Sequence, residues 1–440
     1  MKIKKEQIFW LSSVLIALAA LTVLVVISFN SGLYTKGSLK KIYYADNISA
    51  AHQIIIDKFN ERHKGEIEVL PVNLPFRKFH TNVKKEILAR VLRSGSEQVD
   101  IFAVDLIWVS RFAKWGLPLK EHISDKELGE IEPFVLESCY SDSNLVAMPL
   151  YVDVGLLYYR RDIIESLPDS DIILKKLQEP ITWKEFIQLG QRFSNSGKAF
   201  FLFPGDNFEG FLCSFQETLS AEVLKRIFYN DPINLNIPEC RKSLSLFVDL
   251  INKYKLSPSF VVEADEYENY MYALHNDAVF IRGWPGFIKQ YREDIARADK
   301  TNLFEMAPLP HFEKQHEIGV YGGWNLMVSK YSKQQKEAVK FLKFVQEEEN
   351  QKILYKQSGF LPTNRRIYNN AKFLDENPAL KQYWHILKRG KHRSYRSDYT
   401  RISDIITYYM NLALKKKISA AEALEQASEK INSKKVFVKK

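Results

Sequence analysis

The residues with the clearest capacity for chemistry are aromatic side chains beside isolated carboxylates, amides and glycines. Asp105 directly follows residues 100–104 (DIFAV), a predicted buried strand, and Trp108 comes shortly after it. Asp153 interrupts an otherwise apolar stretch, where an unpaired carboxylate would cost several kcal/mol. The same combination of ring and polar group recurs at Tyr151, Glu209, Trp284, Trp324 and Asn325. Aromatic rings stack on the apolar C–H faces of a sugar, while acids and amides form hydrogen bonds with its hydroxyls. The combination is therefore suited to sugar binding.

These residues also have structural explanations. A Trp beside glycines, as in residues 282–287 and 322–325, is commonly a core residue or part of a turn. Asp105 could instead cap a helix that begins at Leu106. A binding site therefore requires that rings and acids far apart in the chain converge in space.

Motifs of the common enzyme classes are absent from the sequence. It contains no Gly-Lys-Ser/Thr phosphate loop, no G-x-G-x-x-G and no G-x-S-x-G. Cys139, Cys213 and Cys240 lack C-x-x-C spacing, so we expect no metal site. Because the enzyme motifs are also missing, we expect that the protein has no cofactor and is not an enzyme. The odd number of cysteines allows at most one disulfide. The remaining catalytic alternative is a carbohydrate hydrolase that uses Asp153 and Glu209 as its carboxylate pair.

The charge argues against a nucleic-acid-binding protein, and the length argues against a single hydrophobic core. The net charge of +10 looks suited to nucleic acid, but half of it belongs to the Lys-rich first 41 residues. The rest is interspersed with acids, so we expect no nucleic-acid partner. A chain of 440 residues exceeds the size of one hydrophobic core, so it should divide into two lobes.

The N-terminus predicts a membrane anchor. Residues 8–29 carry no charge and are long enough, at about 1.5 Å per residue, to cross a hydrocarbon core of about 30 Å. The lysines that precede them favour a cytoplasmic tail over residues 1–7. We expect one transmembrane helix in the inner (cytoplasmic) membrane, a linker over residues 30–41, and residues 30–440 facing the periplasm or exterior. A cleaved export signal is the alternative, although no A-x-A pattern follows.

The elements that position the candidate residues alternate between strands and helices. Strands are predicted at residues 41–45, 67–72 and 100–104, and helices at 50–63 and 81–93. This alternation is typical of an α/β fold with parallel strands, whose ligands bind beyond the carboxyl ends of the strands, where Asp105 would lie. Capping-box pairs, Thr182 with Glu185 and Ser419 with Glu422, predict two further helix starts.

The ordered set of segments resembles the extracellular solute-binding proteins of ABC importers, of the maltose/trehalose-binding type. The segments that carry the resemblance are residues 100–105 (DIFAVD) with Trp108, 113–119 (AKWGLPL), 148–153 (MPLYVD) with 157–162, 182–186 (TWKEF), 283–285 (GWP), 307–310 (APLP), 322–325 (GGWN), 359–363 (GFLPT), 399–402 and 420–431. Together they extend over nearly all of residues 40–432.

The resemblance implies a two-lobed periplasmic-binding-protein fold, hinged and class II-like, with three crossings between the lobes. It places the crossings near residues 148–151, 303–306 and 328–330. The N-lobe would comprise residues 42–149 and 304–328, and the C-lobe residues 150–303 and 329–432. Residues 433–440 would form a basic tail.

The resemblance also assigns ligand-binding positions. Those facing the ligand from the N-lobe would be Asp105, Trp108, Trp324 and Asn325. Those from the hinge and the C-lobe would be Tyr151, Asp153, Glu209, Trp284 and Arg393. The tryptophans would stack on the sugar, Asp105 and Asp153 would accept from hydroxyls, and Asn325 and Arg393 would donate. Two departures are the retained membrane segment and Ser394, which follows Arg393 where relatives usually have proline.

The resulting expectation is a membrane-tethered receptor that captures a di- or oligosaccharide for the permease subunits of an ABC importer. The alternative is a sugar-sensing co-receptor for a membrane histidine kinase. The tether motivates this alternative because a fixed receptor cannot diffuse between importers. Binding of a non-sugar solute is a further alternative.

Overall fold

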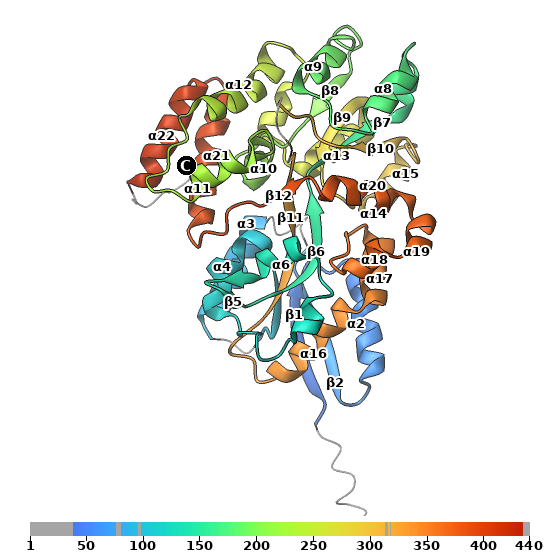
Figure 1. Cartoon of the computed structure of the whole chain (residues 1–440), viewed down its shortest axis with the longest axis vertical. Helices are drawn as coiled ribbons and strands as arrows, with labels where there is room; N and C mark the ends of the chain where they lie inside the picture. Colours follow the sequence, from blue (N-terminus) through green and yellow to red (C-terminus); the bar gives the residue numbers. More distant parts are fainter. Residues whose placement is uncertain (1–37, 76–80, 96–97, 313–315, 317, 434–440) are drawn as a thin grey trace, which may run out of the picture.

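The computed structural model describes residues 38–75, 81–95, 98–312, 316 and 318–433. Two α/β lobes lie one above the other, and strands β6 and β11 run between them (Figure 1). The two-lobed α/β prediction is therefore confirmed. The predicted anchor at residues 8–29 lies outside the described residues. Within those residues, the helices are all too short or too polar to cross a membrane.

The N-lobe contains a mixed sheet in the order β12-β11-β3-β1-β2, with β6 also paired to β11. β1 is parallel to β2 and β3, whereas β11 is antiparallel to β3 and β6. The strands are β1 (Lys40–Asp46), β2 (Ile67–Asn73), β3 (Ile101–Asp105), β6 (Met148–Val154), β11 (Gly319–Val328) and β12 (Gly390–Lys391), and a hairpin joins β4 (Tyr140–Ser141) to β5 (Asn144–Leu145). The helical elements are α2 (Ala50–Arg62), α3 (Thr81–Arg93), η1 (Leu106–Trp108), α4 (Val109–Phe112), η2 (Ala113–Trp115), α5 (Asp125–Leu128), α6 (Pro133–Leu136), η3 (Glu137–Cys139), α16 (Gln335–Gln346) and α17 (Glu348–Ser358).

The C-lobe is built on a second sheet in the order β10-β7-β9-β8. Its strands are β7 (Leu156–Arg160), β8 (Ala199–Leu202), β9 (Ala278–Gly283) and β10 (Phe304–Ala307). Its helical elements are α7 (Arg161–Glu165), α8 (Ser170–Lys176), α9 (Trp183–Gln191), α10 (Glu209–Glu217), α11 (Ala221–Phe228), α12 (Pro238–Asn252), η4 (Ser259–Glu263), α13 (Glu266–His275), α14 (Phe287–Gln290), α15 (Arg292–Arg297), α21 (Tyr399–Leu414) and α22 (Ala420–Asn432). Beside the hinge lie α18 (Arg365–Tyr368), α19 (Ala371–Glu376) and α20 (Pro378–Leu387) (Figure 1).

Local sequence patterns predicted several elements to within one or two residues. The predicted strands and helices before residue 105 correspond to β1, α2, β2, α3 and β3. Both capping boxes are present, with Thr182 before α9 and Ser419 before α22. β1 begins at Lys40, so the end of the predicted 30–41 linker belongs to the sheet instead.

The predicted lobe boundaries need correction at the first two crossings. β6 is paired with β11 from Met148 to Val154, so the chain changes sheets at Gly155 rather than at residues 148–151. The second crossing is not at residues 303–306, because β10 there pairs antiparallel with β7 of the C-lobe. It falls between β10 and β11.

The third crossing is also later than predicted. Beyond residue 328 the chain stays with the N-lobe, where the amide of Ser329 donates to the carbonyl of Asp100 at 2.8 Å. Phe341 of α16 then packs against Tyr44 and Phe59, with ring centroids 5.6 and 5.1 Å apart. α20 already contacts the C-lobe, where Nε2 of Gln382 donates to the carbonyl of Met306 at 2.8 Å. α21 then lies within the C-lobe, packed against α10, α12 and α22. The apolar faces of α16 and α17 are buried against the N-lobe, which explains the difference.

Candidate functional site

Tryptophans from the two lobes meet at the strand that joins them. Trp324 lies on β11, and Trp284 follows β9 of the C-lobe. The indole of Trp284 lies against Gly322, since a Cβ placed there would be 2.8 Å from Cζ3 of the ring. Gly322 and Trp324 share one face of β11, because alternate residues of a strand point the same way. Asp153 is the register partner of Gly322 on β6 and joins the same group.

The N-lobe contributes neighbouring side chains from three strands. Trp324 pairs in register with Asp105 of β3 and with Tyr151 of β6, so the three point to one face. Trp108 packs edge-on against Trp324 with ring centroids 5.6 Å apart. Because Trp108 is only 2% exposed, it supports Trp324 from inside the lobe. Tyr151 stacks on Phe360 at 4.0 Å, so one of its two faces is occupied.

A buried ion pair packs against Trp324. Nζ of Lys84 donates to Oδ1 of Asp46 at 2.7 Å and lies 3.9 Å from the centre of the Trp324 ring. The Tyr44 hydroxyl donates to the other Asp46 oxygen at 2.7 Å. Burial alone would raise the pKa of Asp46, but Lys84 and His52 outweigh it, so this pKa lies below its usual value. The ion pair and the cation–π contact together fix the orientation of Trp324.

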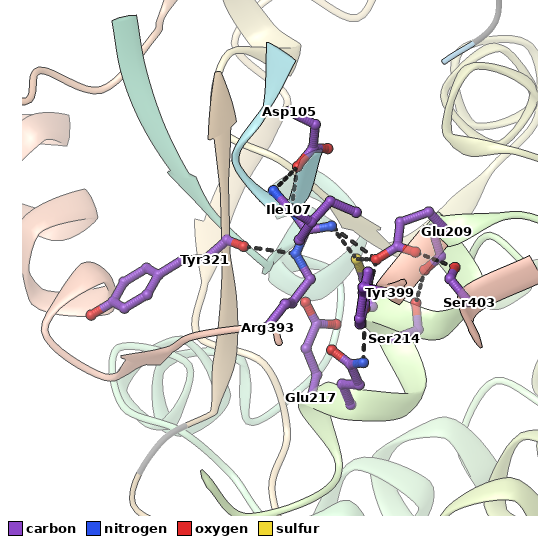
Figure 2. A network of polar contacts seen from close by, with 12 residues as sticks. Asp105, Ile107, Glu209, Ser214, Glu217, Tyr321, Arg393, Tyr399 and Ser403 are labelled. Atoms are coloured by element: carbon purple, nitrogen blue, oxygen red, sulfur yellow. Dashed lines mark hydrogen bonds and ion pairs between the residues drawn. The ribbon is translucent and has the colours of Figure 1, made fainter. Parts of the chain in front are cut away.

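Arg393 connects the two lobes through opposed carboxylates (Figure 2). Nη2 donates to Oδ1 of Asp105 at 2.9 Å, and Nη1 donates to Oε1 of Glu209 at 2.9 Å. Nε donates to the carbonyl of Tyr321 at 3.1 Å. Asp105 ends β3 of the N-lobe, whereas Glu209 begins α10 of the C-lobe. Burial lowers the pKa of Arg393, yet the surrounding acids, Asp105 first, raise it further, so the guanidinium stays charged.

The two acids of this network are held on their other sides as well. Asp105 accepts from the backbone amide of Ile107 at 3.2 Å, so the helix-cap explanation and the ion pair both hold. Glu209 accepts from the hydroxyls of Tyr399, at 3.0 Å, and Ser403. Burial raises the pKa of Glu209, although Arg393 opposes this.

Arg282 organises a second cluster around Trp284. Its guanidinium carbon lies 3.9 Å from the centre of the Trp284 ring. Nη2 and Nε donate to the two carboxylate oxygens of Glu217 at 2.6 and 3.1 Å. Glu266 accepts from Nε1 of Trp284 at 3.2 Å and lies 3.8 Å from Nη1 of Arg282. Both the face and the edge of Trp284 are therefore fixed by charged groups.

Asp153 is the carboxyl of this region that lacks a partner. Its Oδ1 is buried and makes no hydrogen bond within the part of the chain that the structure describes. Burial, and then the charge of Asp105, raise the pKa of Asp153 well above its usual value, although Arg282 opposes this. A donor from a ligand would satisfy Oδ1, because an unsatisfied buried acceptor is unfavourable.

Asn325 does not join the group, contrary to the prediction. Its Nδ2 donates to the carbonyl and the hydroxyl of Ser138 at 3.2 and 2.9 Å. It lines a small hollow together with Ser138, Tyr151, Tyr321 and Gly322. Strand alternation turns its side chain away from that of Trp324, since consecutive residues point to opposite faces. The other predicted site residues lie around β6, β11 and Arg393.

Several polar residues of the region were not predicted. Lys84 had no distinguishing signal, because a lysine in an amphipathic helix is usually exposed. Arg282 directly precedes the Gly283-Trp284 pair. Its charged side chain beside this pair could have indicated a residue of the site. Asp46 ends the first strand, and its polar type at a strand end is the signal that could have marked it. All three cysteines are free and buried, so no disulfide forms. Among the described residues, no group of His, Cys, Asp and Glu could hold a metal ion.

Comparisons with known proteins agree with this architecture. The family model of the bacterial extracellular solute-binding protein matches residues 44–352. A relative from Deinococcus radiodurans, described as a probable ABC transporter-binding protein, is 26% identical over 347 residues, which cover 76% of this chain and 79% of the relative.

Solved structures share the fold. T. maritima MalE3 with bound maltose has a TM-score of 0.77 and 24% identity, over 90% of this chain and 99% of that one. An Agrobacterium vitis ABC transporter solute-binding protein with bound D-mannitol has a TM-score of 0.71 and 18% identity, over 90% and 97% of the two chains.

The family match extends over well more than half of the chain, and the two lobes joined by β6 and β11 have the architecture of the solved structures. These relatives bind solutes and are not enzymes, which confirms the expectation that the chain is not an enzyme. The chain belongs to the family of bacterial extracellular solute-binding proteins.

Proposed function

We propose that this protein is a receptor that captures a di- or oligosaccharide outside the cytoplasm and delivers it to an ABC importer. The observation that carries the proposal is the convergence of Trp284 and Trp324 from different lobes on one face of β11, beside the unpartnered Asp153. Rings that cover apolar faces, with acids at their edges, are the combination that sugar recognition requires. The maltose and D-mannitol carried by two proteins of the same fold support it.

The roles of the residues follow from their contacts. Trp324 and Trp284 supply ring faces, while Asp153 and Asp105 accept hydrogen bonds from hydroxyls. Tyr151 stacks on Phe360, which leaves only its other face for a ligand. Arg393 and Glu209 mainly hold the lobes together, since Arg393 is 2% exposed and already bonded to both lobes.

Closure of the lobes would be the signal that the importer reads. The hinge contains Gly323 with a φ of +123°, where a Cβ would lie 2.4 Å from the carbonyl oxygen of Tyr151. Only glycine fits this position without strain. A sugar that contacts both lobes binds the closed form better, and it shifts the equilibrium by that difference in affinity.

Calorimetric titration of the full chain against a panel of neutral and charged mono-, di- and oligosaccharides tests the proposal. At least one member should bind with one site per chain. A folded sample that binds no member of the panel would overturn the proposal. Uptake of the bound sugar should then fall in cells that lack the protein and recover when it is restored.

The membrane tether is the second part of the proposal. Residues 8–29 hold the receptor to the membrane as one helix, with residues 30–440 outside the cytoplasm. The charge-free sequence of residues 8–29 supports it. The full chain should remain with membranes after washing with alkaline carbonate. Release of a shortened chain into the soluble fraction would instead indicate a cleaved signal.

The alternative output is sensing, in which a histidine kinase of the membrane reads the closed receptor. The proposed tether favours it, because a fixed receptor serves one membrane partner. Neighbouring genes distinguish the two outputs, with permease genes favouring import and a sensor-kinase gene favouring signalling.

A further inference from the structure

The end of the N-lobe that lies away from the C-lobe, which we call the base, is where the proposed anchor joins the fold. β1 begins there at Lys40, and α16 lies at the same end (Figure 1). Residues 30–39 separate β1 from the proposed anchor at residues 8–29. Fully extended, these residues span at most about 36 Å, at about 3.6 Å each, so an anchored chain keeps its base close to the membrane.

The buried Asp100 holds three segments of the chain together at the base. Its Oδ2 accepts from the amide of Tyr43 on β1 at 2.8 Å, and its Oδ1 accepts from the hydroxyl of Ser332, which follows β11. The amide of Lys330 donates to the carbonyl of Trp115 at 2.9 Å, which adds η2 to the group. Residues 329–336 and η2 therefore lie together at this end of the lobe.

The base carries exposed cations that form no ion pair with any residue that the structure describes. They are Lys114 of η2, Lys330 after β11, Lys336 of α16, and Arg90 and Arg93 in the last turn of α3, which leads into β3. Residues 329–336 (SKYSKQQK) contain three lysines and no acid. Such a run of one charge sign is suited to an anionic surface.

The acids of this end offset only part of the charge. Glu337 is already bonded to Nζ of Lys40. On the turn between α2 and β2, Glu61 lies 3.8 Å from Lys64, and Glu66 is exposed. One exposed acid without an ion pair thus faces five exposed cations without one, and the base is positive.

Apolar side chains are exposed beside these cations. Among the described residues eight large hydrophobic side chains are exposed, and three of them lie at the base, namely Leu39, Tyr43 and Tyr331. Nζ of Lys330 lies 5.3 Å from the centre of the Tyr331 ring. Phosphate groups of a lipid attract the ammonium, while tyrosine rings enter the layer between headgroups and acyl chains. A phospholipid surface therefore fits the base better than a surface that offers charge alone.

We propose that the base docks on the anionic phospholipid headgroups of the membrane to which the chain is tethered. This inference rests on the tether of the proposed function, because the tether brings the base near the bilayer. Cations close to an anionic bilayer are attracted to it, and the attraction falls off within the Debye length. β3 begins beside Asp100 and ends at Asp105, so the ligand residues lie at the other end of this strand. A docked N-lobe therefore turns them away from the bilayer and toward solvent.

Lysine acetylation of the full chain in nanodiscs tests the inference, with the modified positions identified by mass spectrometry. One set of nanodiscs contains phosphatidylcholine alone, and the other also contains about one-third of the anionic phosphatidylglycerol. Lys114, Lys330 and Lys336 should react at least about threefold more slowly in the anionic discs, and recover in about 1 M salt, where the Debye length is about 3 Å. Lys184 and Lys225, exposed on the C-lobe, should react alike in both.

The failure of the docking and the failure of the tether give different results. Equal rates at the base in the two bilayers, with the full chain retained in the discs, would overturn the docking and leave the tether intact. Release of a shortened chain from membranes by carbonate washing would overturn the tether and the docking together. Sugar capture is measured separately by titration and depends on neither result.

A triple variant provides the second measurement, and it combines Lys114→Gln, Lys330→Gln and Lys336→Gln. Lys41 and Lys333 remain exposed at the base and report on its protection. Anionic lipid should slow their acetylation in the parent but not in this variant. The matched control loses the same charge from exposed positions of the C-lobe, through Lys175→Gln, Lys184→Gln and Lys225→Gln, and should keep the slowing. Slowing in the base variant equal to that of the parent would contradict the role of the three lysines.

Discussion

The indole of Trp284 is in direct contact with the backbone of Gly322, where even a methyl group would come within 2.8 Å of the ring. Trp284 belongs to the C-lobe, whereas Gly322 lies on the strand that carries Trp324. The contact therefore sets the distance between the tryptophans of the two lobes. It depends on the absence of a side chain at position 322.

Gly322→Ala should push Trp284 away from β11. We expect ligand affinity to fall by about tenfold, equivalent to about 1.4 kcal/mol, because the ring no longer reaches its stacking position. Titration calorimetry with the ligand identified from the panel measures this affinity. Gly129→Ala is the control, since Gly129 is exposed with a φ of −65° and a Cβ there would lie 3.3 Å from its nearest neighbour. Unchanged affinity in Gly322→Ala would exclude Trp284 from ligand contact.

Arg393→Met should open the lobes. Removing the guanidinium leaves Asp105 and Glu209 buried without a counter-ion, which costs about 3–5 kcal/mol for a buried pair. Opening hydrates both acids, so the free protein should show a larger radius of gyration in small-angle X-ray scattering and bind its ligand more weakly. Arg297→Met, at a side chain that is 75% exposed, should change neither quantity. An unaltered radius of gyration with unaltered affinity would contradict the inference that Arg393 holds the two lobes together.

Stability should decline as pH falls below about 6.5, the usual pKa of histidine, partly through His52. Burial lowers the pKa of His52 in the folded protein, and Lys84 adds to this while Asp46 opposes it. Below that pH the unfolded chain binds more protons than the folded one, so the free energy of unfolding decreases on acidification. Melting temperatures between pH 7.5 and 5 measure the slope. His52→Asn should reduce the dependence of the melting temperature on pH. His275→Asn, at an exposed position, should leave that dependence unchanged. An unchanged dependence in His52→Asn would contradict the role of His52.

The thiols should be unreactive in the native protein. Burial raises the pKa of Cys139 and of Cys240 to about 12, and Cys213 is 1% exposed. Because the thiolate is the reactive form, a thiol reagent at pH 8 should modify no cysteine in the folded protein and all three after denaturation. Rapid reaction of one thiol in the folded protein would show that its surroundings open.

Local patterns predicted elements well and boundaries between lobes poorly. Capping boxes and apolar periodicity are local, so α9 and β3 could be read from the chain itself. The crossings depend on distant partners, such as the pairing of β10 with β7. No local pattern in α16 distinguishes packing against one sheet from packing against the other.

The candidate site shows the same limit. Residue types near strand ends led to the prediction of Asp105, Asp153 and Trp324, because polar groups and rings at such positions are unusual in a core. The bridge from Arg393 to Asp105 joins residues 288 positions apart, which no spacing rule anticipates. The prediction that Asn325 faces the ligand took no account of strand alternation, which turns the side chain of Asn325 away from that of Trp324.

The late entry of α21 into the C-lobe determines when that lobe can finish folding. Ile402, Ile405, Ile406 and Met410 are fully buried there, against helices made nearly two hundred positions earlier. A growing chain therefore carries an incomplete C-lobe, with an uncovered apolar surface on α10 and α12, until α21 is synthesised. Premature termination anywhere before α21 would leave a product prone to aggregation and proteolysis, however well its N-lobe had formed.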